Sequence, residues 1–448
     1  MKPDEYQSYV IKNNKNMLVL AGAGTGKTFC IVNKVLYLKE QYGATDEDFL
    51  IISFTNESVN DLKRKINIDN IYTFHKLALH ILNGKYTLCN ESLLTYIINE
   101  YFYSFITTSE KKKILFYYFS ISYTFFLKSS NFKDLKNIIL TYIKLIKANN
   151  LNTNYIISNL KHEKDKFIIG IILKIYTLYE MEKESQNKLD LDDLIIKASK
   201  IKKEYSYRYI FIDEFQDTSQ IRFDLIYNIY KNSNSKLFLF GDDFQSIYRF
   251  TGCNLNIMLD IKKYIYDIEV VRLRRTFRNS QELINIANHF ITRNPKQLKK
   301  DMISDKSIKS PIEIIRYTNP KKEFLKLIKK LDMSDVLILG RNNNDLLKYT
   351  GDNYRYLTIH KSKGLECKNI IIINVENSNN SLPSKIKNYY LIDKINDFKE
   401  IKYAEERRLF YVALTRTKEK VYILTPKNNE SIFIKELEKI IKQNKKGI

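Results

Sequence analysis

The 448-residue sequence lacks tryptophan and is poor in cysteine, proline and histidine, with four, six and five residues. The cysteines are far apart and form no Cys-x-x-Cys pair, so with so few histidines we expect no dedicated zinc or iron–sulfur site. Glycine is also scarce, because its 12 residues are under half of the roughly 7% that proteins usually contain. Seven of these glycines fall in segments that are assigned functions below: Gly22, Gly24, Gly26, Gly241, Gly252, Gly340 and Gly364.

Long apolar runs and a secretory leader are missing as well. The longest uncharged apolar run, residues 114–127, has 14 residues, short of the roughly 18 to 20 that a membrane-spanning helix needs, and it predicts a buried helix. The N-terminal residues MKPDEYQSYV carry acids where a signal peptide has a basic and then an apolar stretch. We therefore expect no membrane association and an intracellular, reducing compartment, either cytoplasm or nucleoid, with a viral or organellar setting left open.

Charge is abundant, and most of it is positive. The chain has 74 Lys and Arg against 51 Asp and Glu, a formal net charge of +23 and a pI of about 9.4. Its hydrophobic fraction of 44% and charged fraction of 28% are those of a globular chain, which excludes wholesale disorder and collagen-like composition. A positive surplus of this size favours a polyanionic partner, nucleic acid ahead of a membrane surface.

Apolar segments divide the chain into two α/β regions. Short strand-like runs alternate with amphipathic stretches, the rhythm of βαβ units around a parallel sheet. Residues 91–185, almost free of Gly and Pro and rich in Tyr, Phe, Lys and Ile, predict a helical insertion. We expect a first domain of residues 1–90 and 186–272, interrupted by this insertion, and a second domain of residues 273–448. The predicted strands are 17–21, 49–54, 209–213 and 236–240, then 312–316, 336–339, 356–359, 370–375 and 421–424.

A phosphate-binding loop follows the first predicted strand. The sequence AGAGTGKT, residues 21–28, opens a helix, and in that context backbone N–H groups and the helix N-terminus cradle phosphates. Lys27 is expected to reach the β and γ phosphates of ATP, and the Thr28 hydroxyl to ligate Mg²⁺. Ala21 stands where the usual pattern has glycine, and the loop alone would also fit a chance strand–turn–helix. The predicted nucleotide-binding residues are Ala21, Gly22, Ala23, Gly24, Thr25, Gly26, Lys27 and Thr28.

Two adjacent acids end another apolar strand. The sequence FIDEFQD, residues 211–217, places Asp213 and Glu214 at the C-terminal end of that strand, where ligands of open α/β sheets bind. We expect Asp213 to hold the Mg²⁺ and Glu214 to orient and deprotonate the attacking water. Such acids alone would equally suit a solvated strand end, but together with the phosphate loop they predict a nucleoside triphosphatase.

Further segments, in order, resemble those of the superfamily 1 helicases of the UvrD/Rep type. FTNESVNDLKRKI and TFHKLAL resemble the two single-strand-contacting motifs of the first motor domain, and LDLDDLI resembles the segment that re-enters it. The likeness is weak only in the helical insertion. It implies two RecA-like P-loop NTPase domains that clamp ATP between them and step along single-stranded nucleic acid. Residues 241–252 resemble motif III, 273–288 motif IV, 338–342 motif IVa, 358–366 motif V and 405–418 motif VI.

The resemblance implies further nucleotide contacts. Gln7 resembles the adenine-recognising glutamine, Phe277 takes the place of an aromatic residue that stacks on the base, and Glu366 resembles the carboxylate that contacts the ribose. Taken singly these residues say little, since most phenylalanines, for example, are core residues.

The resemblance also implies the catalytic groups that cross the cleft. Gln245 matches the glutamine that senses the γ-phosphate, and Arg278 and Arg416 match two arginines that reach from the second domain to the transferred phosphoryl group. Arg341 is expected as a third cation of the cleft. Without their motifs these arginines would be read as solvated or paired surface residues.

A strand-binding face is expected on both domains. A motor that steps along any sequence grips the backbone and stacks bases without reading their edges. Phe250 stands where the family usually has tryptophan, and the smaller phenyl ring predicts a weaker grip. Core packing is the alternative for Phe54 and Phe74, and His75 is not expected to bind a metal because the pattern offers no second ligand. The candidates are Phe54, Thr55, Asn56, Thr73, Phe74, His75, Tyr248, Phe250, His360 and Lys363.

One departure from the family concerns the second domain. UvrD-like enzymes normally carry a large helical accessory domain ahead of motif V, whereas here 16 residues, 342–357, fill that place, so that domain is predicted to be absent. The insertion 91–185 corresponds to the accessory domain of the first motor and is either a nucleic-acid contact or an ordinary helical bundle.

Together the motifs predict a nucleoside triphosphatase, and the resemblance implies an ATP-dependent 3′ to 5′ DNA helicase or translocase for DNA repair or replication. The direction of movement and the preference for DNA rest on the resemblance alone. Its expected partners are single-stranded DNA or a 3′-tailed duplex and a loading or accessory protein not identified by the sequence, and RNA stays open as a substrate. The alternative is an ATP-gated single-strand clamp, or a translocase that strips proteins, without autonomous unwinding.

Overall fold

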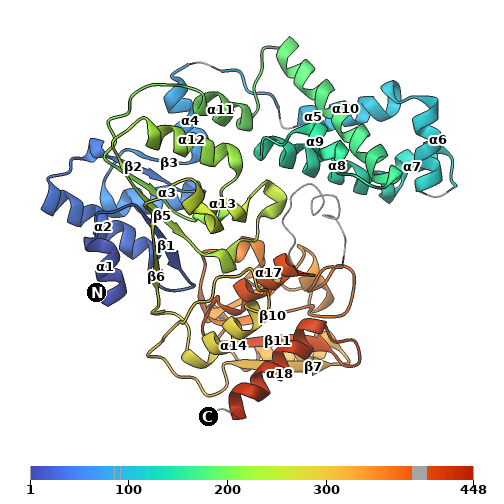
Figure 1. Cartoon of the computed structure of the whole chain (residues 1–448). Helices are drawn as coiled ribbons and strands as arrows, with labels where there is room; N and C mark the ends of the chain where they lie inside the picture. The colour runs from blue at the N-terminus through green and yellow to red at the C-terminus, as the bar shows by residue number, and fades with distance from the viewer. Residues whose placement is uncertain (1, 85, 91, 119, 386–400, 447–448) are drawn as a thin grey trace.

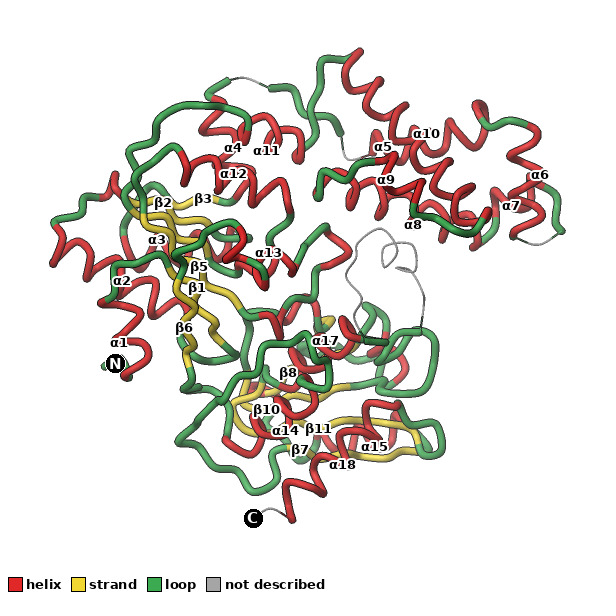
Figure 2. Tube along the Cα trace, in the orientation of Figure 1, coloured by secondary structure: helices red, strands yellow, loops and turns green. Residues whose placement is uncertain are grey.

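The computed structural model describes residues 2–84, 86–90, 92–118, 120–385 and 401–446. These residues form two parallel sheets, each covered by helices, and a separate group of helices (Figures 1 and 2). The predicted α/β class, with two parallel sheets and a helical insertion, is confirmed. No helix in the described residues is both long and apolar enough to span a bilayer.

The first sheet has six strands within the described residues, all parallel, in the order β3-β2-β4-β5-β1-β6. Its central strands are continuous apolar runs such as MLVLA in β1, as expected of parallel strands that are buried on both faces. The four strands predicted for this sheet are present, whereas the short β3 and the partly exposed edge strand β6 were not predicted. The strands are β1 Met17–Ala21, β2 Phe49–Ile52, β3 Ile71–Tyr72, β4 Tyr209–Ile212, β5 Lys236–Gly241 and β6 Glu269–Leu273.

Helices cover both faces of this sheet. One face packs against α2 and α3 in a core that includes Val35, Leu62 and Phe211, with α1 lying on α2. The other face packs against α4, α11, α12 and α13. The helices are α1 Glu5–Lys12, α2 Lys27–Tyr42, α3 Asn56–Ile66, α4 Phe74–Leu82, α11 Leu191–Ser199, α12 Gln220–Lys231 and α13 Leu255–Leu259.

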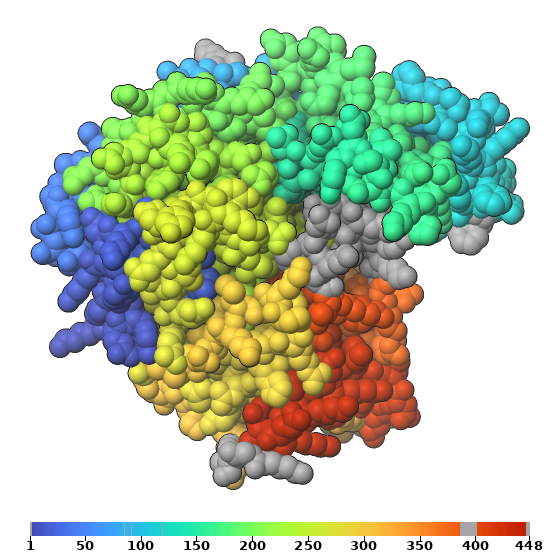
Figure 3. Space-filling view, in the orientation of Figure 1, coloured from blue at the N-terminus to red at the C-terminus, as the bar shows by residue number. Residues whose placement is uncertain are grey.

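The second sheet has five strands in the described part of the chain, again all parallel, in the order β7-β11-β10-β8-β9. All five predicted strands are present. Helices α14, α17 and α18 cover one face and α15 the other, and Figure 3 shows this domain, in orange and red, resting directly against the first. The elements are β7 Ile312–Tyr317, β8 Val336–Gly340, β9 Tyr356–Thr358, β10 Cys367–Ile372, β11 Thr417–Pro426, α14 Gln281–Ile291, α15 Pro320–Ile328, α17 Ala404–Leu414 and α18 Ile432–Lys446.

The insertion is a helical bundle with its own core, set to one side of the first sheet (Figure 1). The apolar run 114–127 does not form one buried helix, so that prediction is wrong. Ser122 caps a new helix within the run, and Phe116 and Phe125 are 84% and 72% exposed, because the run is aromatic all round while only one face of each helix meets the bundle. The helices are α5 Ser92–Glu100, α6 Thr108–Tyr117, α7 Tyr123–Lys128, α8 Ser130–Ala148, α9 Thr153–Ser158 and α10 Glu163–Ser185, with a π-helical turn at Tyr101–Phe105.

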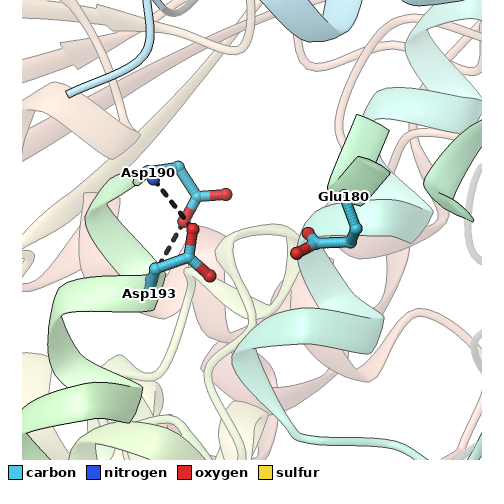
Figure 4. Close-up of side chains that lie close together, drawn as sticks. All are labelled: Glu180, Asp190 and Asp193. Atoms are coloured by element: carbon cyan, nitrogen blue, oxygen red, sulfur yellow. Dashed lines mark hydrogen bonds between the residues drawn. The ribbon is translucent and has the colours of Figure 1, made fainter. Parts of the chain in front are cut away.

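A partly buried cluster of charges attaches the insertion to the first domain. Glu180 of α10 faces Asp190 and Asp193 at the start of α11, and these two aspartates cap each other's backbone N–H (Figure 4). Two buried lysines of the insertion, Lys147 and Lys183, form ion pairs with all three carboxylates. The two lysines offset two of the three negative charges and contact all three carboxylates, so we interpret the cluster as an anchor and not as a metal site.

Candidate active site

The phosphate-binding loop joins the end of β1 to the start of α2. Gly24 and Gly26 have φ angles of 73° and 81°, in the left-handed region that glycine enters without steric cost. The loop folds back on itself, since Thr25 Oγ1 donates to Gly22 O at 3.0 Å. It ends at Lys27, the first residue of α2, so free N–H groups and the helix dipole favour an anion there.

Gln7 of α1 braces this loop. Helix α1 begins with a capping box in which the side chains of Asp4 and Gln7 each accept the other's backbone N–H. The buried Gln7 amide also donates from Nε2 to Thr25 O at 3.0 Å. The structure therefore brings Gln7 to the phosphate loop, and its contact with adenine stays a prediction.

The two predicted acids follow β4 directly and face the loop. Glu214 has a φ of 52°, an uncommon conformation for a residue with a side chain. This backbone conformation accompanies an ion pair between its Oε1 and Lys27 Nζ. Its other oxygen accepts a hydrogen bond from Gln216, and Asp213 Oδ1 accepts the Glu214 N–H at 2.9 Å. The loop and the acids, 187 residues apart in sequence, thus form one site.

The two carboxyl groups differ in acidity. Burial raises the pKa of Asp213 to about 6, and the nearby Lys27 opposes this rise only in part. Burial would also raise the pKa of Glu214, but the cations of Lys27 and Lys363 outweigh it and hold that pKa below its usual range. Such divergence between neighbouring carboxyls is typical of catalytic sites.

The chain that leaves β6 for the second domain crosses the phosphate loop. Thr276 Oγ1 donates to Ala23 O at 2.8 Å, and the Phe277 N–H donates to Gly24 O at 2.9 Å. A Cβ on Gly24 would lie 2.5 Å from Arg278 Cβ. The predicted residues Phe277 and Arg278 therefore lie against the loop.

The two predicted arginines lie close to each other. Arg278 Nε donates to Glu366 Oε2 at 2.8 Å, and its Nη1 donates to Thr415 O at 3.3 Å. Arg416 is only 1% exposed, and burial together with the charge of Arg278 lowers its pKa to about 9. The negative charge of Glu214 acts in the opposite direction and raises the pKa of Arg416. Two guanidinium groups that repel each other beside a phosphate loop form a site for an anion.

Gln245 joins the first domain to Arg416. It follows β5 and is buried, and its Oε1 accepts from Arg416 Nη2 at 3.0 Å.

Glu366 pairs with Arg278 and, at 2.7 Å, with Lys418. Burial would raise the pKa of Glu366, but the hydrogen bonds from Lys418 and Arg278 lower it below its usual value.

Lys363 lies on the nucleotide side of the domain interface, where its ammonium group is bound by residues of the first domain. Its Nζ pairs with Asp217, donates to Gln245 O at 3.0 Å and lies 3.7 Å from Glu214 Oε2. Acids of the first domain bind the Lys363 ammonium group in this arrangement, and its role as a strand-binding residue stays a prediction. Asp217 is a site residue that the sequence reasoning did not single out, since its partner comes from the other domain.

The two aromatic residues predicted for the strand-binding face of the first domain differ in exposure. The rings of Phe54 and Phe74 are 5.2 Å apart and meet edge to face. Phe74 is buried in the core, as the core-packing alternative predicts, whereas Phe54 is partly exposed; base stacking on either ring stays a prediction. Arg222, which was not predicted, lies 5.5 and 5.8 Å from the two ring centroids and donates to Asp217 O at 3.4 Å.

The polar candidates of this face lie at helix starts. Thr55 and Thr73 are the N-cap residues of α3 and α4, and Asn56 is exposed at the first position of α3. Burial, then the charges of Arg222 and Lys144, lower the pKa of His75 to about 4, so this imidazole is neutral near pH 7.

A second aromatic group spans the two domains. Tyr248 and Phe250 follow β5 in the first domain, and His360 follows β9 in the second. The rings of Phe250 and His360 are 5.6 Å apart, and the Tyr248 hydroxyl donates to His360 O at 2.9 Å. Burial, then Arg341 and Lys363, lower the pKa of His360 to about 4. The structure thus brings these three strand-binding candidates together.

Arg341 is engaged by an acid of its own domain. It forms a two-pronged ion pair with Glu406 of α17, with Nη2 2.8 Å and Nε 3.2 Å from Oε1. Its role as a third cation of the nucleotide cleft stays a prediction.

Two parallel sheets, a phosphate loop at the end of a central strand and arginines that approach it from the second domain define a P-loop nucleoside triphosphatase with two RecA-like domains. Residues 3–265 match the family model of the UvrD/REP helicase N-terminal domain, and residues 347–428 match that of the UvrD-like helicase C-terminal domain. The chain belongs to the UvrD/Rep helicase family.

Curated relatives support this assignment. The chain is 27% identical to DNA helicase IV of Escherichia coli (strain K12), over 96% of this chain and 69% of that protein. It is 28% identical to the ATP-dependent DNA helicase Rep of Buchnera aphidicola subsp. Acyrthosiphon pisum (strain APS), over 71% of this chain and 49% of that protein. It is 25% identical to Rep of E. coli (strain K12), over 73% of this chain and 50% of that protein. The chain therefore spans about half the length of these Rep proteins.

Proposed function

We propose that this protein is an ATP-dependent DNA helicase or translocase that moves 3′ to 5′ on single-stranded DNA. Family membership and the names of the relatives support the substrate and the activity. One observation carries the proposal: the second domain supplies Arg278 and Arg416 to a phosphate loop and carboxylates of the first. Turnover at such a shared site changes how the two domains meet, and this change is the source of movement.

The residues present fit a nucleoside triphosphate and a divalent cation. The loop offers backbone N–H groups and Lys27, and the buried Arg416 adds a guanidinium group whose pKa is lowered by burial and by the charge of Arg278, which an anion bound beside it would offset. Thr28, in the first turn of α2, and Asp213 offer the hard oxygen ligands that suit Mg²⁺. Bound ATP would supply the electrophilic phosphorus and its leaving group, and Mg²⁺ would offset the negative charge of the phosphate oxygens.

The ion pair between Lys27 and Glu214 must break before either residue acts on ATP. Lys27 exchanges its carboxylate partner for a phosphate oxygen, which leaves Glu214 free to orient a water molecule. Because Lys27 holds the pKa of Glu214 down, loss of this contact raises that pKa and makes Glu214 a stronger base. Arg278 and Arg416 offset the charge of the transferred group, a task worth roughly 10³ to 10⁵ in kcat.

An ATPase assay with single-stranded DNA, RNA and duplex side by side tests the proposal. We expect stimulation by single-stranded DNA, and no turnover in Lys27→Ala or Glu214→Gln. Undiminished hydrolysis in the Lys27 variant would overturn the site assignment.

The alternative, a nucleotide-gated clamp or protein-stripping translocase, is favoured by the short connection between β8 and β9, which leaves no room for the large accessory domain of UvrD-like enzymes. A strand-displacement assay on 3′-tailed and 5′-tailed duplexes separates the two functions and reports the direction of movement. ATPase activity without displacement from either duplex supports the clamp or stripping function.

A further inference from the structure

A segment of the second domain lies along the nucleotide site of the first. Residues 294–303, here called the strap, follow α14 and end in a bridge with the chain that leaves β6, where Ile303 N donates to Arg274 O at 2.8 Å and Thr276 N donates to Ile303 O at 2.9 Å. Near its end, the Met302 methyl carbon lies 3.0 Å from the position of a Cβ on Gly22. The strap therefore reaches the phosphate loop.

The strap carries a buried lysine to two buried acids. Lys300 is 3% exposed and forms ion pairs with both Asp242 and Asp243, which follow β5 and are 0% exposed. Its Nζ also lies 3.8 Å from the centroid of the Phe244 ring. Asp243 Oδ2 accepts two further hydrogen bonds from the strap, from Gln297 Nε2 at 3.1 Å and Leu298 N at 2.9 Å.

These contacts lead directly to the catalytic groups. Asp242 Oδ2 accepts from Gln245 Nε2 at 2.5 Å, and Gln245 Oε1 accepts from Arg416 Nη2 at 3.0 Å. Four side chains, Lys300, Asp242, Gln245 and Arg416, thus form one hydrogen-bonded series that starts in the second domain, passes through the first and returns to the second.

Apolar packing around Phe244 surrounds the hydrogen-bonded series of Lys300, Asp242, Gln245 and Arg416. Phe244 lies between the domains in a small core with Ala287, Ile291 and Tyr411, and its ring is 5.2 Å from that of Tyr411. Both aspartates lie in low-dielectric surroundings, where an unpaired carboxylate is costly. Lys300 offsets one of the two negative charges and gives Asp242 a fixed orientation.

We propose that Lys300 is a positioning residue for ATP hydrolysis: it orients Asp242, which orients the amide of Gln245, which in turn holds the Arg416 guanidinium for the γ-phosphate. The proposal rests on the proposed ATPase function. Gln245 needs a defined amide orientation because its oxygen faces Arg416 while its nitrogen faces Asp242. Loss of Lys300 lets this amide rotate or shift, which misplaces the arginine.

The test is a kinetic comparison of Lys300→Met with Lys299→Met, its exposed neighbour on the strap. We expect Lys300→Met to lower kcat about tenfold or more, to change the KM for ATP less than about threefold, and to weaken binding of ADP with aluminium fluoride but not of ADP alone. Lys299→Met should match the wild type in all of these. A Lys300→Met protein with wild-type kcat and analogue binding overturns the inference, whereas a wild type without ATPase activity overturns the proposed function.

A double variant separates positioning from charge balance. Lys300→Met with Asp243→Asn removes one charge of each sign, so the net charge of the buried group is unchanged and folding is protected. Circular dichroism and thermal unfolding verify that it folds. We expect kcat to stay low, because Asp242 still lacks its partner. Recovery of wild-type kcat in the double variant would mean that Lys300 serves only to neutralise Asp243, and would refute the positioning role.

Discussion

Replacement of Gly24 by alanine tests whether the two domains meet at the phosphate loop. The added methyl group would lie 2.5 Å from Arg278 Cβ and 2.7 Å from Thr276 Oγ1, both in the segment that leads to the second domain. The left-handed φ of 73° adds a backbone cost of about 1 to 2 kcal/mol, which acts on the fold as a whole. The clash costs about 1 to 3 kcal/mol and acts only on the closed arrangement of the domains.

These two costs predict separate effects. At 1.36 kcal/mol per tenfold, a closure penalty of about 1 to 3 kcal/mol lowers kcat by roughly 5- to 160-fold, while the backbone cost lowers the free energy of unfolding. Gly43→Ala is the matched control, because Gly43 has a φ of 60° and a Cβ there meets nothing within 4 Å. It should lose about the same stability and keep its kcat.

Steady-state ATPase measurements with saturating single-stranded DNA give kcat for both variants, and urea denaturation gives their stability. The reasoning is refuted if Gly24→Ala keeps the wild-type kcat while losing as much stability as Gly43→Ala. That result would mean that residues 276–278 do not rest on the loop during turnover.

Further variants test the arginine, the strand-binding face and the anchor of the insertion. Arg416→Ala should cut kcat about 100-fold or more while ADP binding, followed by titration, stays intact. Phe54→Ala should weaken single-stranded DNA binding by about 1 to 3 kcal/mol in fluorescence anisotropy. The same assay at several salt concentrations should give a log–log slope near −0.7 per phosphate contact, and a flat response would contradict the proposed groove. Lys183→Met should lower the free energy of unfolding by about 1 to 3 kcal/mol, because Lys147 still pairs with the same carboxylates, whereas Lys197→Met, at an exposed position of α11, should leave it unchanged.

In the first sheet, the sequence predicted the central strands better than the edge strands. Runs such as MLVLA in β1 are apolar because both faces are covered, and that composition is visible without a structure. Strand β6, EVVRL, is only partly buried at the edge of its sheet, and β3 has two residues, so neither carries such a pattern. Continuous apolar composition also misled at 114–127, since it does not reveal which side of a helix meets a neighbour.

The phosphate loop and the acids were predictable because each lies in a short local motif with known chemistry. The partners of Lys363 and Lys300 were not, because an ion pair between domains depends on how two separately folded sheets meet. A lysine in a basic chain is most often solvated, and nothing in the residues beside Lys300 distinguishes it from the exposed Lys299. Such residues are identified only by their burial and by the acids they contact.

The chain enters and leaves the helical insertion at adjacent points. Leu189 pairs with Leu88 in an isolated parallel bridge, its N–H donating to Thr87 O at 3.0 Å and its carbonyl accepting the Cys89 N–H at 2.9 Å. Among the residues that the structure describes between these points, none belongs to a strand of either sheet. A tight turn in place of the insertion would therefore leave the strand order of the first sheet intact.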